Sequence, residues 1–519
     1  MLYLLACLAP PEGGDGARGT AGSTGAGELV LNEVLPRNQS TWDDGSVQFP
    51  DWVELYNPGT TPAPLEGVTL SDGEGIWHGD GALAPGARLL VPLDAAAPFR
   101  LGADETLTLA DASGVLDQLA LGAPDPDVAW ARHPDGGEWA LTVWTTPGAA
   151  NPTAPDDTLD PSAVAFGPGA IHAVGIELSA DAVESLRVDR LTWVEGAVTL
   201  DGLRYAPVAV RLKSEHGSRR EIGEKPGWKI DLDTFAGLRW RGQESLTLNN
   251  MVQDETYLRE HLTYTFFRAL GVPAPRVGWA TVSLNGEAYG LSLLVETVDD
   301  TFLARWYDDP TGALYEGSHG IDLVPGHEAR FEYDEGPDPD DRADLTAVID
   351  ALQAPPDAAG IAHLETLVDL DQVLTYLATE RLALHWDGYK NTNNYRLYHD
   401  PQSGRFDLLP WGADNTFDVV QMDAWEGRGK LLRWCLESDV CAARYDTRLV
   451  EVADTLDTLG LVEEVLAGAA RLRPAIVQDA RREFPLSVHD GELAQTVERL
   501  EAWPDEVRAM VAAGRPNPK

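Results

Sequence analysis

Two aspartates and one asparagine in the C-terminal half of the sequence have the residue types and order needed for metal-assisted phosphoryl transfer. Asp387 opens a polar loop, Asn394 lies in the same loop, and Asp414 follows a turn-containing segment. Carboxylate and carboxamide oxygens are ligands for Mg²⁺, and bound metal offsets the charge of a transferring phosphoryl group. These side chains form a candidate site if the fold brings them together.

The elements around these residues are predicted to bring them together. Apolar residues at helical spacing predict a helix just before Asp387. The turn sequence at 399–404 predicts a hairpin whose first strand begins at residue 395. A short hairpin places Asp387 and Asp414 at one end of a sheet, where we expect their carboxylates to face a common cleft and share bound metal.

A strand lysine and a helix glutamate are predicted to complete the site. Residues 225–233 alternate, so that Lys229 lies on the face opposite the apolar side chains. A helix expected at 255–270 follows Asp254, an N-cap residue type, and carries Glu260 off its apolar stripe. Such a lysine can hold nucleotide phosphates and pair with the glutamate. A solvated lysine and a surface glutamate are the alternatives.

The order of these segments is that of protein kinases, in which a loop Asp receives the proton of the substrate hydroxyl, a following Asn holds metal and a later Asp binds Mg²⁺. Residues 170 to about 445 also resemble the CotH (spore coat protein H) kinase family. The matching residues are Lys225-Pro226, Trp228-Lys229, Asn249-Asn250-Met251, Asp254, Leu258-Arg259-Glu260, 271–275, 284–286, Tyr289-Gly290, Glu296, Asn393-Asn394-Tyr395, Leu397-Tyr398 and Asp414.

This resemblance implies an α+β fold of the atypical protein kinase type, which transfers phosphate from ATP to Ser of a protein with Mg²⁺ or Mn²⁺. Carried over by position, Asp387 is the catalytic base, and Asn394 and Asp414 are metal ligands. Lys229 contacts the ATP phosphate and takes part in catalysis. The other cofactor-binding residues implied are Lys225, Glu260 and Glu296, the last of which lies near the hinge between lobes.

One carboxylate of the family pattern is absent. Many members read Pro-Trp-Asp-x-Asp, whereas Gly412 stands at the first of these Asp positions, before Asp414. Asp407 or Asp418 are candidates to replace it.

The catalytic loop and the phosphate-binding strand also differ from ordinary kinases. The step from Asp387 to Asn394 is longer than in ordinary kinases, which leaves Asn391 or Asn393 as alternative metal ligands. No glycine-rich phosphate loop or Walker A sequence precedes Lys229.

Residues 28–152 are predicted to form an all-β sandwich. Short apolar or alternating runs, separated by Pro and Gly at close spacing, are typical of sandwich strands. The segments 31–34, 51–58, 65–72 and 146–152 resemble the lamin-tail domain. The resemblance implies an immunoglobulin-like sandwich without catalytic residues, and we expect it to bind a surface partner or act as a spacer.

The sequence therefore predicts a multidomain protein: an all-β sandwich followed by an α+β kinase-like domain with a helical C-terminal region. The expected parts are a truncated signal or lipobox with a flexible linker at 1–27, the sandwich at 28–152, a linker at 153–165, the kinase-like domain at 166–446 and a helical extension packed on it at 447–519.

The charge of the chain excludes some partners. The formal net charge is −45, so binding to nucleic acid or to anionic lipid is not expected. A net charge of this size otherwise serves to keep a protein soluble. No apolar run is long enough for a transmembrane helix.

The cysteines indicate an extracytoplasmic location. The segment ending in Cys7 resembles a bacterial lipobox with Cys7 as lipid anchor, but it is too short for a signal peptide. Either the true start lies upstream, which we favour, or the match is chance; residues 9–27 have the composition of a tether. We expect Cys435 and Cys441 to form a local disulfide, with two unpaired thiols as the alternative.

We therefore expect a lipoprotein or secreted bacterial protein that phosphorylates Ser of a surface or secreted protein. The alternative is a non-catalytic cell-surface binding or adhesion protein that retains the kinase-like fold, since extracytoplasmic ATP is scarce and Gly412 removes a ligand. Transfer from ATP to an acceptor other than protein is a third interpretation.

Overall fold

The computed structural model describes residues 29–43, 49–93, 99–156, 158–167, 169, 171–213, 217–418 and 423–515. The chain divides into two compact units. The first contains residues 50–159 and those up to 38, and the second contains residues 39–49 and 160–519. The candidate lipobox at Cys7 and the expected tether lie outside the described residues.

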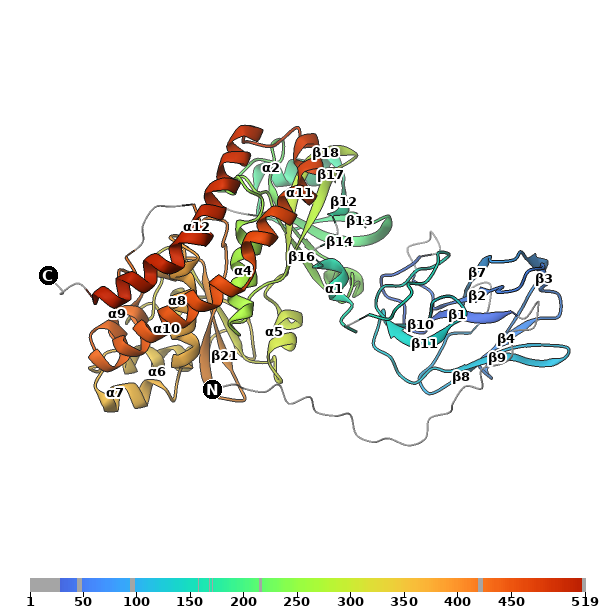
Figure 1. Ribbon diagram of the computed structural model, residues 1–519, viewed down its shortest axis with the longest axis horizontal. Helices are drawn as coiled ribbons and strands as arrows, with labels where there is room; N and C mark the ends of the chain where they lie inside the picture. The colour runs from blue at the N-terminus through green and yellow to red at the C-terminus, as the bar shows by residue number, and fades with distance from the viewer. Residues whose placement is uncertain are drawn as a thin grey trace. The chain divides into compact units, whose positions relative to one another are not determined.

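The described part of the first unit is built from β-strands (Figure 1). One sheet has the order β11-β10-β1-β2-β7 and another β5-β4-β8-β9, while β3 pairs with β6. Alternation along the strands places Leu31, Val53 and Leu107 in one apolar core. The all-β region is confirmed, and the lamin-tail resemblance stays a prediction. The strands are β1 Val30–Leu35, β2 Trp52–Tyr56, β3 Ala63–Pro64, β4 Thr69–Ser71, β5 Ile76–His78, β6 Ala82–Leu83, β7 Arg88–Pro92, β8 Thr106–Asp111, β9 Gly114–Ala120, β10 Ala129–His133 and β11 Glu138–Thr142.

Two buried glutamates, on strands β1 and β2, form hydrogen bonds to the segment after β11. Glu33 accepts hydrogen bonds from the backbone N–H and the hydroxyl of Thr146, both at 3.1 Å. Glu54 accepts from the side chain of Asn32 at 2.8 Å and from the backbone N–H of Gly148 at 2.7 Å. Burial raises the pKa of Glu33 to about 8. Residues that matched the lamin-tail pattern therefore have a structural role.

The second unit contains a closed barrel in the order β12-β13-β14-β15-β16-β18-β17, in which β17 pairs in parallel with β12. Leu212, Trp228 and Ile230 point into its apolar core, so the strand around Lys229 alternates as predicted. The elements are α1 Ser162–Ala165, β12 Ile171–Leu178, α2 Ala180–Val188, β13 Val194–Leu200, β14 Leu203–Lys213, β15 Gly227–Asp231, α3 Asp233–Ala236, β16 Ser245–Asn249, α4 Arg259–Ala269, β17 Val277–Leu284 and β18 Glu287–Val295.

A lobe of helices and a small sheet follows the barrel. The sheet has the order β20-β19-β21-β22, and β21 and β22 form the hairpin predicted around 399–404. The helix expected before Asp387 is α8, which is buried from Val373 to its end. The elements are α5 Asp300–Trp306, β19 Ala313–Gly317, η1 Glu328–Arg330, β20 Glu332–Glu335, α6 Ala343–Ala351, α7 Ala358–Leu364, α8 Leu370–Leu382, η2 Tyr389–Asn391, β21 Tyr395–Asp400 and β22 Arg405–Pro410.

The chain ends in helices α9 Lys430–Leu436, α10 Asp439–Thr458, α11 Leu461–Gln478 and α12 Leu486–Ala513. The boundary expected at residue 447, between the kinase-like domain and the helical extension, lies inside α10. This helix begins before the expected boundary and ends after it. Cys435 on α9 and Cys441 on α10 form the expected disulfide, with Cα atoms 5.1 Å apart. In the part of the chain that the structure describes, no helix has the length and apolar character needed to cross a membrane.

Candidate active site

A lysine at the end of β14 and a glutamate on α4 are joined through one asparagine. The Nζ of Lys213 donates a hydrogen bond to Oδ1 of Asn249. The side-chain N–H of Asn249 in turn donates to Oε2 of Glu260 at 2.6 Å, and the hydroxyl of Tyr264 donates to the other oxygen of Glu260 at 2.9 Å. Glu260 is buried, and these two hydrogen bonds hold its carboxylate in one orientation.

The strand lysine opposite Glu260 is therefore Lys213, whereas we expected Lys229. In the ladder of β14 and β15, Lys213 pairs with Gly227, and Arg211 pairs with Lys229. Both lysines lie on the barrel face that points away from the apolar core, but Lys213 is the one that reaches α4. The sequence did contain a signal for Lys213. Arg211 and Lys213 alternate with apolar residues, which places both side chains on the outward face of the strand.

Helix α4 begins later than predicted. The sequence predicted a start at residue 255 after Asp254, but the first helical residue is Arg259. The buried carboxylate of Asp254 accepts hydrogen bonds from the backbone N–H groups of Thr256 and Tyr257, and from that of Arg259 at 2.8 Å. Asp254 therefore satisfies the first N–H of the helix from outside the usual cap position and fixes where α4 begins.

Asp414, which follows β22, lies close to Lys213 and Glu260. Burial raises the pKa of Asp414 to about 8; the Glu260 carboxylate adds to the rise and Lys213 opposes it. Burial also lowers the pKa of Lys213, which Glu260 opposes. Two carboxylates and one lysine thus share a poorly solvated place with an excess of negative charge. A bound cation would stabilise this arrangement.

Asp387 lies in the loop after α8, where two asparagines hold its carboxylate. Asn393 donates a hydrogen bond to Oδ1 at 3.1 Å, and Asn394 donates to Oδ2 at 3.0 Å. Asn394 also donates to the backbone carbonyl of Asp387 at 3.0 Å. Burial raises the pKa of Asp387, and both asparagines oppose the rise. An oriented carboxylate of this kind can receive the proton of a substrate hydroxyl.

The β21–β22 hairpin connects this loop to the segment that carries Asp414. The backbone N–H of Trp411 donates to the carbonyl of Asn394 at 3.3 Å. Gly412 has a φ of +54°, and a Cβ atom there would lie 2.9 Å from Cγ of Asn394. The Asn394 side chain thus packs directly on the Gly412 backbone. The hairpin brings the Asp387 loop and the Asp414 segment to one end of its strands.

Lys229 faces a cavity of about 290 Å³ that Trp411 also lines. Burial lowers the pKa of Lys229, and the guanidinium groups of Arg396 and Arg211 lower it further. The Lys213 ammonium and the Arg396 guanidinium lie 5.2 and 4.6 Å from the centroid of the Trp411 ring. The remaining wall contains Trp193, many carboxylates, and residues 297–300 from the segment after β18. The cavity therefore lies where the barrel passes into the second lobe.

Two residues expected to bind cofactor form ion pairs inside the fold. Lys225 donates to Asp479 at 2.7 Å, and both side chains are buried. Glu296 follows β18 as predicted, but its buried carboxylate pairs with both Arg276 and Arg305. Breaking a desolvated pair is strongly destabilising. Neither Lys225 nor Glu296 is therefore free for the nucleotide contact that we expected.

Two of the alternative ligands considered from the sequence, Asp407 and Asn391, form hydrogen bonds with other partners. Asp407 accepts a hydrogen bond from the hydroxyl of Tyr307 at 2.9 Å, and Asn391 donates to the carbonyl of Trp386 at 2.6 Å. The Arg259 guanidinium lies near Asp418 and opposes the rise in pKa that burial gives this carboxyl.

The donor set fits a metal ion that is shared with a phosphorylated ligand. Among the residues that the structure describes, no three His, Cys, Asp or Glu side chains are grouped closely enough to hold a metal. Mg²⁺ is usually held by one or two carboxylates, water and substrate phosphates. Asp414 and Asn394 supply oxygen atoms of this type, and the negative charge around Asp414 favours a cation.

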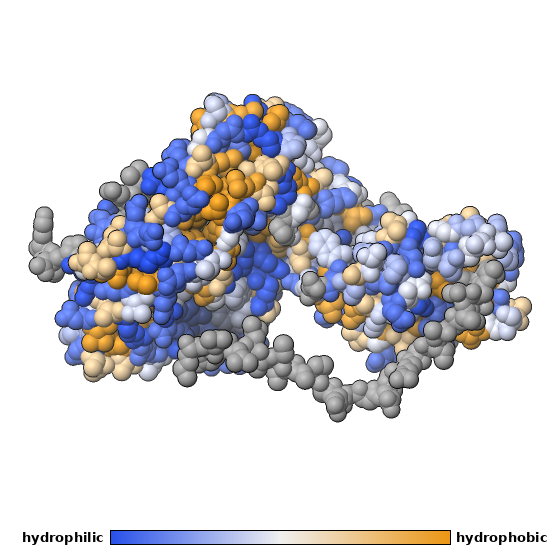
Figure 2. Space-filling view, in the orientation of Figure 1, coloured by the Kyte–Doolittle hydropathy of each residue, from blue (hydrophilic) through white to orange (hydrophobic). Residues whose placement is uncertain are grey.

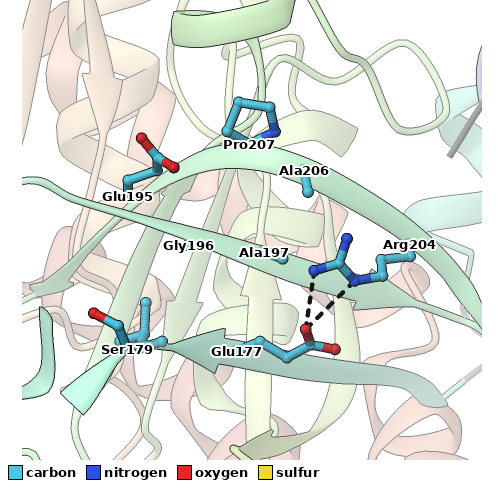
Figure 3. Close-up of a pocket in the computed structure, with 9 residues that line it drawn as sticks. Glu177, Ser179, Glu195, Gly196, Ala197, Arg204, Ala206 and Pro207 are labelled. Carbon is cyan, nitrogen blue, oxygen red and sulfur yellow. Dashed lines mark hydrogen bonds and ion pairs between the residues drawn. The ribbon is translucent and has the colours of Figure 1, made fainter.

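A wider hollow of about 590 Å³ lies on the barrel surface (Figure 3). Small residues such as Gly196 and Ala197 line it, together with Arg204 and Glu177, which form an exposed ion pair at 3.1 Å. The residues that line it include none of those predicted for the site. We therefore assign the candidate site to the cluster around Lys213, Asp387 and Asp414.

Sequence comparison gives a family match and curated relatives. Residues 214–511 match the family described as CotH kinase protein. Inner spore coat protein H of Bacillus subtilis (strain 168) is 26% identical over 275 residues, which cover 49% of this chain and 74% of that protein. Invasin CotH2 of Rhizopus delemar is 26% identical over 268 residues, which cover 46% of this chain and 42% of that protein. The chain thus spans less than half of the fungal relative.

Comparison with solved structures gives a distant similarity. The structure described as the Shewanella oneidensis MR-1 toxin–antitoxin system HipA, HipB and its operator DNA complex is 13% identical, with a TM-score of 0.27. The match covers 57% of this chain and 68% of that chain. We draw no structural conclusion from a similarity at this level.

Proposed function

This chain belongs to the CotH kinase family, and on that premise we propose that it is an atypical, metal-dependent protein kinase that transfers the γ-phosphate of ATP to serine of a surface or secreted protein. The observation that carries the proposal is the bridge from Lys213 through Asn249 to Glu260 beside Asp414. A lysine–glutamate pair next to a metal-binding aspartate is the arrangement that kinases use to hold nucleotide phosphates.

We place the nucleoside of ATP in the cavity that Lys229 faces and the phosphates toward Lys213. Carboxylates such as Asp300 and Glu335 predominate in the cavity wall, and they repel phosphate but accept hydrogen bonds from a base or a ribose. Lys213 carries the positive charge nearest Asp414. Lys229, at the side of Trp411, is placed to interact with the part of the nucleotide between the two regions.

Asp387 would act as the general base. Its carboxylate takes the proton from the serine hydroxyl while the serine oxygen bonds to the γ-phosphorus and the bond to the ADP oxygen breaks. Asn394 and Asp414 would hold the metal ion, with Asn393 and Asn394 keeping Asp387 in orientation. When bound, Mg²⁺ or Mn²⁺ neutralises charge on the β- and γ-phosphates.

We also propose that the protein acts outside the cytoplasm. The Cys435–Cys441 disulfide is of a kind that persists in oxidising compartments, and the named relatives are a spore coat protein and an invasin. A lipid anchor at Cys7 and a surface partner for the lamin-tail-like unit belong to the same proposal.

A non-catalytic binding protein is the second candidate. Gly412 takes the place of a possible metal ligand, and two of the curated relatives carry the name invasin. In that case, the cluster around Asp414 would persist for packing alone and would not bind nucleotide.

Calorimetric titration with ATP distinguishes the two candidates. Full-length protein should give a binding heat with Mg²⁺ or Mn²⁺, and Lys213→Met should weaken binding more than Lys229→Met, since Lys213 is the lysine that bonds to Asn249, which holds Glu260. Arg204→Ala, in the barrel hollow, is a control and should bind as the wild type does. Absence of heat from the wild type with either metal would leave the binding-protein interpretation.

A further inference from the structure

The C-terminal helix α11 touches the start of α4 at close range. A Cβ atom at Gly468, within α11, would lie 2.7 Å from Cδ2 of Leu258. Leu258 immediately precedes α4 and is completely buried, so it has little room to move away. Figure 1 shows α11 and α12 running past α4. The two helices approach each other this closely only because residue 468 has no side chain.

Polar contacts reinforce this packing on the same side of α4. The ring of His261 lies 3.1 Å from the carboxylate of Glu464 on α11. The guanidinium of Arg259, which is buried, donates to Glu492 on α12 at 2.8 Å. The α4 residues that face the C-terminal helices are therefore those on either side of Glu260 in sequence.

The other side of α4 faces the candidate site. Glu260 points to Asn249 and Lys213. One turn further on, the hydroxyl of Thr263 donates to that of Thr416 at 2.8 Å, in the segment that follows Asp414. Helix α4 is thus held between the C-terminal helices and the site residues.

The C-terminal helices are themselves fastened to both lobes. Asp479, at the end of α11, accepts hydrogen bonds from Lys225 at 2.7 Å and from the backbone N–H of Leu291 in β18 at 3.0 Å. The indole N–H of Trp503 on α12 donates to the carbonyl of Arg381 on α8 at 3.2 Å. Figure 2 shows apolar side chains gathered where these helices run. Such a bridge resists movement of α4 relative to either lobe.

We propose that α11 and α12 are a built-in positioning element for the active site, with Gly468 and Glu464 as the residues that keep α4 where Glu260 meets Lys213. This inference rests on the proposed function, because it assigns the C-terminal helices a role in phosphoryl transfer. The chain then places its own α4 and needs no second protein to do so.

The test compares leucine at two helical glycines of the full-length protein. Gly468→Leu drives a side chain into Leu258, whereas Gly491→Leu, in α12, meets open space. Both changes favour helix to the same extent. Misplacement of a site by about 1 Å can cost about 10²-fold in rate. We expect Gly468→Leu to lower kcat for phosphate transfer by roughly ten- to a hundredfold, with a smaller change in KM for ATP, and Gly491→Leu to leave both unchanged.

A compensating change separates positioning from general damage. Leu258→Ala makes room for the new leucine, so the double variant Leu258→Ala/Gly468→Leu should regain at least part of the lost kcat. Two unrelated defects would instead add. Equal kcat in Gly468→Leu and Gly491→Leu, or a double variant slower than Gly468→Leu alone, overturns the inference.

Amide hydrogen exchange tests the inference about α11 and α12 separately from the proposed kinase function. If the wild type transfers no phosphate, the proposed function fails, but the exchange of α4 amides still reports on the position of the helix. Faster exchange of α4 in Gly468→Leu than in Gly491→Leu supports a holding role for α11. The same exchange in both variants overturns it.

Discussion

A carboxyl in the first unit and one in the second have the same raised pKa but different surroundings. Burial raises the pKa of Glu33 and of Asp414 to about 8 in each case. Thr146 donates to Glu33 through neutral backbone and hydroxyl groups, and the carboxylates of Glu54 and Asp135 add to the rise in its pKa. Asp414 faces an ammonium group, that of Lys213, as well as the carboxylate of Glu260. A raised pKa therefore does not by itself mark a functional site. The kind of partner distinguishes a structural carboxyl from a candidate metal ligand.

The two carboxyl groups, of Glu33 and Asp414, also differ in their exposure to solvent. Glu33 is completely buried, while Asp414 is partly exposed and follows shortly after Trp411, which lines the cavity. A ligand can reach the second carboxyl and not the first. If this comparison is correct, changes at the two places should separate activity from stability.

The largest expected effect is that of Asp414→Asn. Loss of the charge should weaken metal binding and lower phosphate transfer by about 10²–10³-fold, and added Mn²⁺ should restore part of the activity. The melting temperature should not fall, because the variant removes a carboxylate that Glu260 repels. Glu33→Gln is the matched control and should transfer phosphate at the wild-type rate. A large loss in both variants, measured at equal folded fraction, would contradict the comparison.

Glu54→Ala should lower the stability of the first unit and leave phosphate transfer unchanged. It leaves the Asn32 side chain and the Gly148 backbone N–H without their buried acceptor. An unsatisfied buried donor costs about 1–3 kcal/mol, so the unfolding transition of the first unit should move to lower temperature in scanning calorimetry. Phosphate transfer should be unaffected. Reduced transfer by a fully folded variant would show that the two units are coupled.

The last expected effect is the pH dependence that Glu33 gives to the first unit. Its pKa rises from 4.5 to about 8 on folding, so the folded state holds the proton more tightly. The stabilisation is complete below pH 4.5 and is lost as the pH rises through 8, by up to about 1.4 kcal/mol per pH unit. Glu33→Gln should flatten this decline in calorimetric scans. Asp51, with a pKa raised to about 6, leaves part of the slope in place.

The local parts of the fold could be predicted from the sequence. Strand alternation around Lys229, the hairpin after Asn394 and the Cys435–Cys441 disulfide depend on residues close together in the chain. The order of Asp387, Asn394 and Asp414 around that hairpin is local in the same sense, and their roles stay predictions.

The remaining site residues depend on tertiary contacts that spacing does not reveal. The position expected for Lys229, next to the asparagine that holds Glu260, is occupied by Lys213, because strand register decides which lysine reaches Asn249. We expected Lys225 to bind cofactor, but in the structure it pairs with Asp479. This partner could not be found from local spacing, because it lies 254 residues away in the sequence.

The change Gly412→Asp illustrates the same limit. From the sequence it would restore a metal ligand of the family pattern. In the structure, the left-handed backbone of Gly412 and the closeness of Asn394 show that any side chain there must displace Asn394. The missing carboxylate and the packing of Asn394 are therefore one feature, and a single substitution cannot restore one without disturbing the other.

Transfer of labelled γ-phosphate from ATP by the full-length protein tests the central claim most directly. With Mg²⁺ or Mn²⁺, the wild type should label its own serines or those of an added serine-rich protein. Asp387→Asn should still bind ATP in calorimetry, yet transfer about 10²–10⁴-fold more slowly, because the shape of the side chain remains but the base is lost. Equal transfer by the wild type and Asp387→Asn, or metal-independent labelling, would contradict the account.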